Sequence, residues 1–239
     1  MKYIVEITDQ IQNFNEYITV TKKNGELIDG TYKMTLQEFL NSLNEAIDLG
    51  DEMLETPILP NNCIKFVWKN INLNVAEVYI VVPKMRRDIT FYQNPMKQVG
   101  FPKMIFKYTI ENQKVSLSTI VALRNDGPIH LDTPLYHFPF SHVSSEGDVC
   151  MGGNTFPNIQ RIQQIESFHN LFLSSPFSSD YGAKTTTGKT INQLFDELAN
   201  QDLDDDLLLP ITKMVAEPET KSLIKKQTTL GEYFKFETI

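Results

Sequence analysis

Cys150 is the residue of this sequence best placed to do nucleophilic chemistry. It follows Val149, which we expect to anchor the chain in the core, and it precedes Gly152 and Gly153, which leave room for a substrate backbone beside the thiol. A cysteine reacts as its thiolate, which a helix N-terminus or a nearby cation favours, and helical periodicity begins near Asn158. Cys150 is therefore a candidate nucleophile. The alternative is a cysteine that packs as a small hydrophobic residue.

Polar side chains in the same segment could assist such a thiol. His142 could donate a hydrogen bond to negative charge that develops in a transition state, and Asp148 or Glu146 could orient or deprotonate an attacking amine. His142 could also be a surface-loop histidine, and the two carboxylates could simply be solvated. The candidate catalytic set is Cys150, His142 and Asp148.

The number and spacing of the cysteines and histidines argue against a metal site. The chain has 2 cysteines, Cys63 and Cys150, and neither belongs to a Cys-x-x-Cys pair. No short zinc pattern matches the spacing of the possible ligands His137, His142, Cys150 and His169. We expect two free thiols, no disulfide framework and no bound metal.

The segment around Cys150 resembles the active-site stretch of ubiquitin-conjugating (E2) enzymes, His-Pro-Asn-hydrophobic-x-x-x-Gly-x-(Val/Ile)-Cys. It is more similar still to a bacterial E2-like family that includes protein B of the PRTRC cassette, with the approximate pattern Leu-Tyr-x-x-Pro-Phe-x-Asn-Val-x-x-x-Gly-x-Val-Cys-x-Gly. The positions that match this pattern are Leu135, Tyr136, Pro139, Phe140, Val143, Gly147, Val149, Cys150 and Gly152. The likeness is dense over residues 135–153 and weaker to residue 177, where Phe-Leu-Ser-Ser-Pro-Phe is similar to that family's Phe-x-x-Ser-x-Phe.

This resemblance implies a function and a set of partners. Cys150 would accept the C-terminal carboxyl of a small ubiquitin-like modifier, as a thioester, from an E1-like (ThiF-type) adenylating enzyme and would pass it to an amine. A thioester stays activated for attack by an amine, and thiol exchange moves it between enzymes without further ATP. The resemblance implies neither a metal nor an organic cofactor.

His142 departs from the family pattern, because it stands where these families carry Asn, eight residues before the nucleophile. The implied role of that Asn is to support the active-site loop or to stabilise the oxyanion when a lysine attacks. An imidazole N–H could replace it, or the exchange could mark altered or lost transfer.

Two other functional classes stay open at this point. A non-catalytic E2-variant scaffold would bind the modifier without a reactive thiol. A cysteine hydrolase would need a histidine as general base, for which the candidates are His142, His137 and His169.

Two short motifs lie after the candidate active site. The tail fits the Gln-x-x-Leu-x-x-aromatic-aromatic pattern of sliding-clamp-binding peptides at Gln227, Leu230, Tyr233 and Phe234. It could instead fold back on its own domain through the last three of these residues. Residues 182–190 resemble a phosphate-binding loop, but five residues separate Gly182 from Gly188 where the motif has four. We expect a flexible link there, leading into a helix capped by Thr190.

Charge and hydropathy set the environment of the protein. With 22 Lys+Arg against 30 Asp+Glu, the net charge of −8 argues against direct nucleic-acid binding. The 41% of hydrophobic residues suffices for a core, and no apolar run approaches the ~18 residues that span a bilayer. We expect no membrane partner and a cytoplasmic location.

Periodicity and turn signals predict the elements that must position Cys150. Residues 1–7 are predicted as a strand and residues 17–32 as a hairpin around Asn24-Gly25, followed by a helix that starts at a Thr35-x-x-Glu38 capping box and stops at Gly50. Strands are then expected over residues 64–68, 75–82, 89–92, 104–110 and 115–123. A loop over residues 126–153 and helices over residues 158–173 and 191–200 complete the order.

Together with the resemblance, this order predicts an α+β fold of the E2 (UBC-like) type, an antiparallel β-meander with flanking helices. A hairpin-helix extension would span residues 1–55 and the E2-like core residues 56–200. An acidic, then apolar, flexible tail would span residues 201–239.

Overall fold

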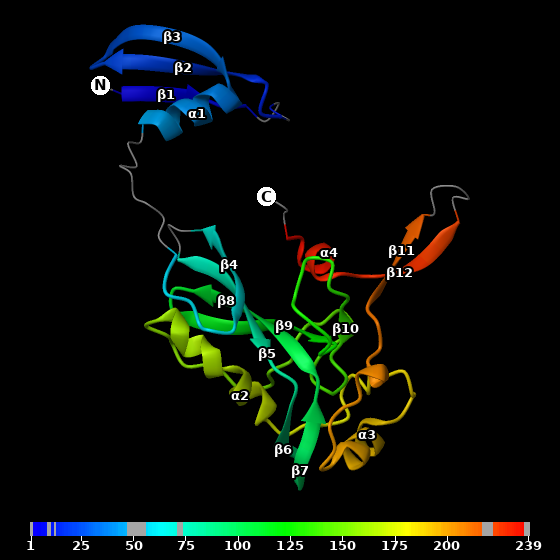
Figure 1. Cartoon of the computed structure of the whole chain (residues 1–239). Helices are drawn as coiled ribbons and strands as arrows, with labels where there is room; N and C mark the ends of the chain where they lie inside the picture. Colours follow the sequence, from blue (N-terminus) through cyan, green and yellow to red (C-terminus); the bar gives the residue numbers. More distant parts are fainter. Residues whose placement is uncertain are drawn as a thin grey trace. The chain divides into compact units, whose positions relative to one another are not determined.

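The computed structural model describes residues 2–8, 11, 13–46, 56–70, 74–216 and 222–236. The chain divides into two compact units, Met1–Glu55 and Thr56–Ile239, whose elements are labelled in Figure 1. No helix within the described ranges is long and apolar enough to cross a membrane.

The first unit is a three-stranded antiparallel sheet with one helix. Its elements are β1 (Lys2–Glu6), β2 (Tyr17–Asn24), β3 (Leu27–Thr35) and α1 (Leu36–Ala46), with the strand order β1-β2-β3. The predicted capping box is confirmed, because the Glu38 N–H donates to Thr35 Oγ1 (3.1 Å) and the Thr35 N–H donates to Glu38 Oε2 (2.8 Å). The predicted end of this helix, Gly50, lies outside the described residues.

A five-stranded antiparallel sheet forms the centre of the second unit. Its strands are β4 (Cys63–Asn70), β5 (Val75–Val82), β8 (Lys103–Glu111), β9 (Lys114–Leu123) and the short β10 (Tyr136–His137), in the order β10-β9-β8-β5-β4. The α+β class and the predicted meander are therefore confirmed.

A separate hairpin is inserted between β5 and β8. It pairs β6 (Met85–Phe91) with β7 (Asn94–Phe101). The sequence prediction missed β7, because Asn94, Pro95 and Gly100 are poor strand formers. The strand forms through its ladder with β6 and through Val99 and Phe101, which are fully buried.

The central sheet is apolar on both faces, because successive side chains in a strand point to opposite sides. Ile80 and Phe106 belong to a large core cluster on one face, whereas their neighbours Tyr79 and Ile105 belong to a second cluster. Each face therefore needs a covering layer.

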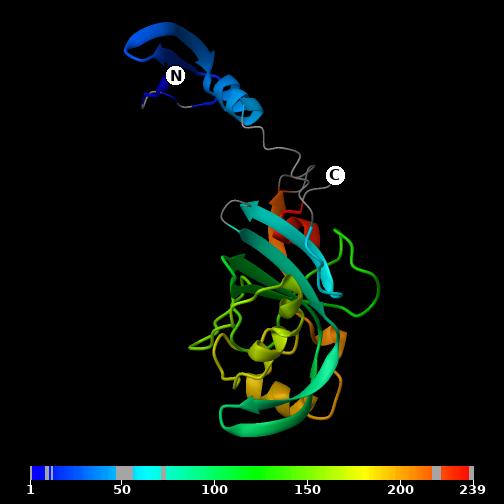
Figure 2. The same cartoon turned by 90° about the vertical axis from the view of Figure 1, so that its left-hand side faces the viewer.

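Short helices cover the first face. They are the 3₁₀ segment η1 (Ile162–Ser167), α2 (His169–Leu173) and α3 (Ile191–Leu198). Phe172 of α2 packs on Phe106 of β8 with ring centroids 5.9 Å apart, and Figure 2 shows the yellow-green segment with α2 against the sheet. Thr190 caps α3 as predicted, since its Oγ1 accepts the Gln193 N–H (3.3 Å).

The predicted helix over residues 158–173 is shorter than expected and starts later. The side-chain oxygen of Gln164 accepts the backbone N–H groups of Gln160 (2.8 Å) and Arg161 (3.0 Å), so Arg161 stays extended and helical structure begins only at Ile162. No helix N-terminus therefore lies directly after Cys150, and the expected support of a thiolate by a helix dipole is corrected.

Residues 203–211 and 228–234 of the tail are packed onto the core, which corrects the prediction of a flexible tail for these parts, whereas the two strands between them pair with each other and are mostly exposed. Its elements are η2 (Asp205–Leu207), β11 (Thr212–Ala216), β12 (Leu223–Gln227) and α4 (Leu230–Phe234). Leu203 and Leu208 join the first core cluster, and Ile211 and Leu230 join the second. In Figure 1 α4 lies against the green loop that follows β9, where the Gly231 N–H donates to the Leu131 carbonyl (2.7 Å).

Ion pairs hold the acidic part of this segment. They are Arg86–Asp202 (2.8 Å), Lys84–Asp205 (2.8 Å) and Arg124–Asp206 (2.9 Å). The acidic run is therefore matched to basic residues of the core, and apolar packing supplies most of its stabilisation, because exposed pairs contribute little.

Leu230→Ala should destabilise the protein strongly, because Leu230 is 3% exposed and its truncation leaves a cavity over the second face of the sheet. We expect the free energy of unfolding in urea to fall by roughly 2–5 kcal/mol. Leu223→Ala is the matched control, because Leu223 is 66% exposed, and it should change stability by less than about 0.5 kcal/mol. A small effect of both substitutions would contradict a packed tail.

Candidate active site

The cysteine loop, residues 142–150, is a small hairpin that ends at the candidate nucleophile. Val143 and Val149 form an antiparallel bridge, and the Ser144 N–H donates to the Asp148 carbonyl (2.8 Å). Gly147 adopts φ +89°, a conformation that side chains with a Cβ rarely take, so glycine is required at this turn.

The same loop is hydrogen-bonded to the edge of the central sheet. The Ile120 N–H donates to the Gly147 carbonyl (3.0 Å), and the Val149 N–H donates to the Ser118 carbonyl (3.3 Å). The loop thus continues along β9 where the short β10 ends. Cys150 follows immediately, and its N–H donates to the His142 carbonyl (2.8 Å).

Cys150 is exposed and lines a pocket of about 190 Å³. The lining residues are His142, Cys150, Met151, Gly152, Gly153, Asn154, Phe172, Ser175, Pro176 and Asp180. The two glycines stand beside the thiol as the sequence suggested, and the pocket contains two predicted site residues, Cys150 and His142. Asp148 is not among the lining residues.

His142 braces the loop with its side chain. Its Nε2 lies 2.9 Å from the Pro176 carbonyl oxygen, and its ring stacks on Phe177 at 5.7 Å. A carbonyl only accepts hydrogen bonds, so Nε2 is the donor in this contact. The N–H of Nε2 therefore supports the loop and is not available to an oxyanion.

The backbone of His142 adopts a conformation that few residue types tolerate. Its φ is +66°, in the left-handed region where Asn, Asp and His are the most common residues other than glycine. An Asn at this position would therefore tolerate the same conformation.

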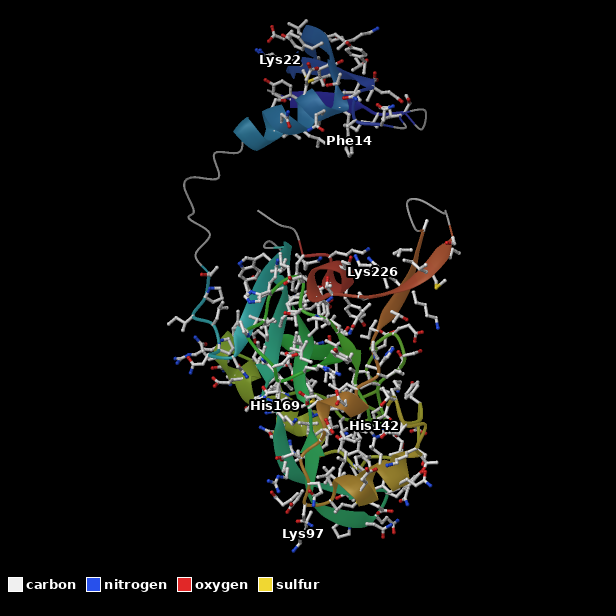
Figure 3. The ribbon with its side chains drawn as sticks, turned by 45° about the vertical axis from the view of Figure 1, so that its right-hand side comes forward. Phe14, Lys22, Lys97, His142, His169 and Lys226 are labelled. Atoms are coloured by element: carbon white, nitrogen blue, oxygen red, sulfur yellow. The ribbon has the colours of Figure 1, made fainter. Side chains whose placement is uncertain are left out.

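The other two candidate bases, His137 and His169, do not line the pocket. His169 packs its ring against Phe106 at 6.1 Å and lies 3.0 Å from the Glu166 carbonyl through Nδ1. Burial lowers the pKa of His169, and burial together with the nearby Lys184 ammonium lowers the pKa of His137. Figure 3 marks His142 and His169 on separate segments of this unit. Of the three candidate bases, only His142 lines the pocket.

Lys184 holds the start of the loop from inside the protein, and the sequence analysis missed this role. Its side chain is buried, and Nζ donates to the carbonyls of Val143 (2.6 Å) and Tyr181 (3.3 Å). Its own N–H donates to the Pro139 carbonyl (3.0 Å). Burial lowers the pKa of Lys184. The segment that resembled a phosphate-binding loop thus buries Lys184, whereas Lys189, the lysine of the motif, forms a surface ion pair with Glu197, and the predicted flexible link is corrected.

Asp180 and Asn154 are further polar residues of the pocket that the sequence analysis did not select. Asp180 accepts a hydrogen bond from Ser178 Oγ (2.7 Å), and Asn154 Nδ2 donates to Ser175 Oγ (3.0 Å). The only sequence signal for Ser175 was its place in the Phe-x-x-Ser-x-Phe stretch. Among the residues that the structure describes, no group of three or more His, Cys, Asp or Glu side chains is arranged to hold a metal ion.

The chain belongs to prokaryotic E2 family D, whose family model matches residues 40–208, more than half of the sequence. The match contains the central sheet, the cysteine loop and the pocket, and it ends before β11. No curated protein and no solved structure matches the chain. The predicted E2-like family is confirmed, whereas the narrower assignment to the PRTRC protein B type stays a prediction.

Lys184→Met should weaken the fold around the cysteine loop, because the buried Val143 carbonyl and the partly buried Tyr181 carbonyl lose their donor. We expect a loss of roughly 1–3 kcal/mol in the free energy of unfolding, measured in urea. The matched control is Lys189→Met. Lys189 forms a surface ion pair with Glu197, and its loss should cost less than about 1 kcal/mol. Equal effects of the two variants would contradict the bracing role of Lys184.

Proposed function

We propose that this protein is an E2-like carrier that holds a ubiquitin-like modifier as a thioester on Cys150. The observation that carries the proposal is an exposed thiol in a pocket, at the end of a loop held in one conformation, in a chain of prokaryotic E2 family D. An E1-like adenylating enzyme is the proposed donor, and an amine is the proposed acceptor.

The proposed transfer has two steps. The Cys150 thiolate attacks the carbonyl carbon of the donor thioester, and the donor's thiolate leaves. An amine then attacks the new thioester, the Cys150 thiolate leaves, and the nitrogen gives its proton to a base or to water. Both steps conserve the acyl group and need no oxidant, metal or organic cofactor.

The second step needs a base for the attacking amine and a donor to the oxyanion, and the pocket has a candidate group for each. Asp180 places a carboxylate where an incoming ammonium would be attracted and where an amine could lose its proton. Asn154 has two amide hydrogens, of which one is donated to Ser175 Oγ, so the other is our candidate donor to the oxyanion. His142 keeps the loop in place through Pro176. Asp148, proposed from sequence, shapes the loop through its backbone carbonyl, which accepts from Ser144.

Charging of Cys150 tests the proposal directly. The full chain is mixed with ATP, an E1-like adenylating enzyme and a small ubiquitin-like protein, both sought among the genes that neighbour its own, and adducts are resolved on gels with and without thiol reductant. Wild type should form an adduct that reductant removes, Cys150→Ala should form none, and Cys150→Ser should form an oxyester that resists reductant. Cys63→Ser is the control, because Cys63 is the other free cysteine, and it should charge normally. A charged adenylating enzyme without an adduct on wild type would favour the non-catalytic scaffold.

Substitution of His142 separates loop support from proton transfer. His142→Asn keeps a residue that tolerates φ +66° and an amide donor, so discharge of the charged protein to free lysine should stay near the wild-type rate. His142→Ala loses the bond to Pro176 and strains the backbone, and it should slow discharge by about tenfold or more. If His142 were instead a general base, both variants would lose activity together, with a pH profile that loses its imidazole limb.

A further inference from the structure

The C-terminal helix α4 reaches the cysteine loop from outside the family match. The Tyr233 hydroxyl donates to the main-chain carbonyl oxygen of Glu146, at the tip of the loop. The family match ends at residue 208, so this contact comes from a part of the chain that the family model does not match.

The fit of Tyr233 against the loop is close. A Cβ built on Gly147 would overlap the Tyr233 hydroxyl, and it would lie 3.1 Å from Cγ2 of Thr119 on β9. The tip of the loop is therefore enclosed between the sheet edge on one side and Tyr233 on the other.

The contacts of α4 fix the position of Tyr233 independently of the loop. Leu230 is buried, its N–H donates to the Thr133 carbonyl (2.9 Å), and the Gly231 N–H donates to the Leu131 carbonyl (2.7 Å). The ring of Tyr233 packs edge-to-face on Phe234 at 4.9 Å. The helix that carries Tyr233 is thus fixed by its own contacts, without the hydrogen bond from the hydroxyl to the loop.

The phenol also stays in the protonated form that a donor requires. Burial, followed by the nearby carboxylates of Asp148 and Glu146, raises the pKa of Tyr233 to about 12. The phenol is therefore protonated at neutral pH and can donate to the Glu146 carbonyl.

The residues that fit the clamp-binding pattern make contacts within the chain itself. Gln227 Nε2 donates to the Leu135 carbonyl (3.3 Å), Leu230 is buried, Tyr233 reaches Glu146, and Phe234 packs on Tyr79 at 5.0 Å. This is the fold-back that the sequence analysis gave as the alternative to a clamp-binding peptide.

We propose that Tyr233 is a positioning residue for Cys150, and that α4 is a structural part of the active site. The hydroxyl holds the Glu146 carbonyl, and through it the turn at Gly147 that leads into Val149 and Cys150. The relevance to catalysis rests on the proposed thioester function, whereas the effect on loop order can be measured without it.

Tyr233→Phe in the full chain is the central variant. It removes the hydroxyl and keeps the ring that packs on Phe234. Tyr79→Phe is the matched control, because the Tyr79 hydroxyl donates to Glu77 Oε2 (2.9 Å) on β5, away from the loop, although its ring contacts the same Phe234.

Hydrogen exchange read by mass spectrometry measures loop order. Exchange of the Gly147 and Cys150 amides, which are bonded to the Ser144 and His142 carbonyls, should rise about fivefold in Tyr233→Phe and stay unchanged in Tyr79→Phe. Charging and discharge of Cys150 should slow in the same variant by a similar factor. Unchanged exchange in Tyr233→Phe overturns the inference, and so does faster exchange with unchanged transfer.

A double variant guards against a general loss of folding. Gly147→Ala should speed exchange of the loop, because its Cβ overlaps the Tyr233 hydroxyl, and adding Tyr233→Phe should recover part of the protection. Strictly additive effects would overturn the contact. If wild type does not charge at all, the proposed function fails, and exchange in the single and double variants still decides whether Tyr233 positions the loop.

Discussion

The apolar character of both faces of the central sheet is the constraint on which the rest of this structure depends. β5 and β8 alternate between the two clusters, so neither face can be left to water without exposing large side chains such as Phe106 or Tyr79. The short helices cover one face, and Ile211 together with α4 covers part of the other. The C-terminal segment is therefore part of the folded domain, although it lies beyond the E2 family match.

This layering determines how the cysteine loop is held. The sheet edge at β9 binds the loop from one side, Lys184 in the link before α3 binds the Val143 carbonyl, and Tyr233 of α4 binds the Glu146 carbonyl. These groups are far apart in sequence and meet only because both faces of the sheet are covered. A reactive group held by several independent contacts needs little reorganisation when a substrate arrives, which is the physical advantage of such an arrangement for acyl transfer.

Charged and polar contacts also join distant segments of the second unit. The acidic run after residue 200 is matched by Lys84, Arg86 and Arg124, so its charge helps to attach the segment to the core. Around the pocket, hydrogen bonds join His142 to Pro176 and Asn154 to Ser175. Asp180 is the carboxylate of the pocket lining, so negative charge is concentrated at one point of its wall.

The sequence alone determined the elements whose signals are local. The capping box at Thr35, the Thr190 cap and the strands rich in β-branched residues depend on residues within a few positions of one another, and the structure has these elements close to where they were predicted. The structure brings His142 and Cys150 to one pocket, because their spacing is that of the hairpin they close.

Only the tertiary structure decided the features that depend on distant partners. β7 forms because it pairs with β6. The helix after Asn158 starts late because Gln164 accepts hydrogen bonds from the backbone N–H groups of the preceding turn. Lys184 is buried where its ammonium group donates to the Val143 carbonyl. The tail looked flexible in sequence because of its acidic run and the breaks at Pro210 and Pro218. Leu203 and Leu208 become fixed where they meet the first face of the sheet, and Ile211 and Leu230 where they meet the second. The need of each face for cover is visible in the alternation of β5 and β8, but the covering segment is not.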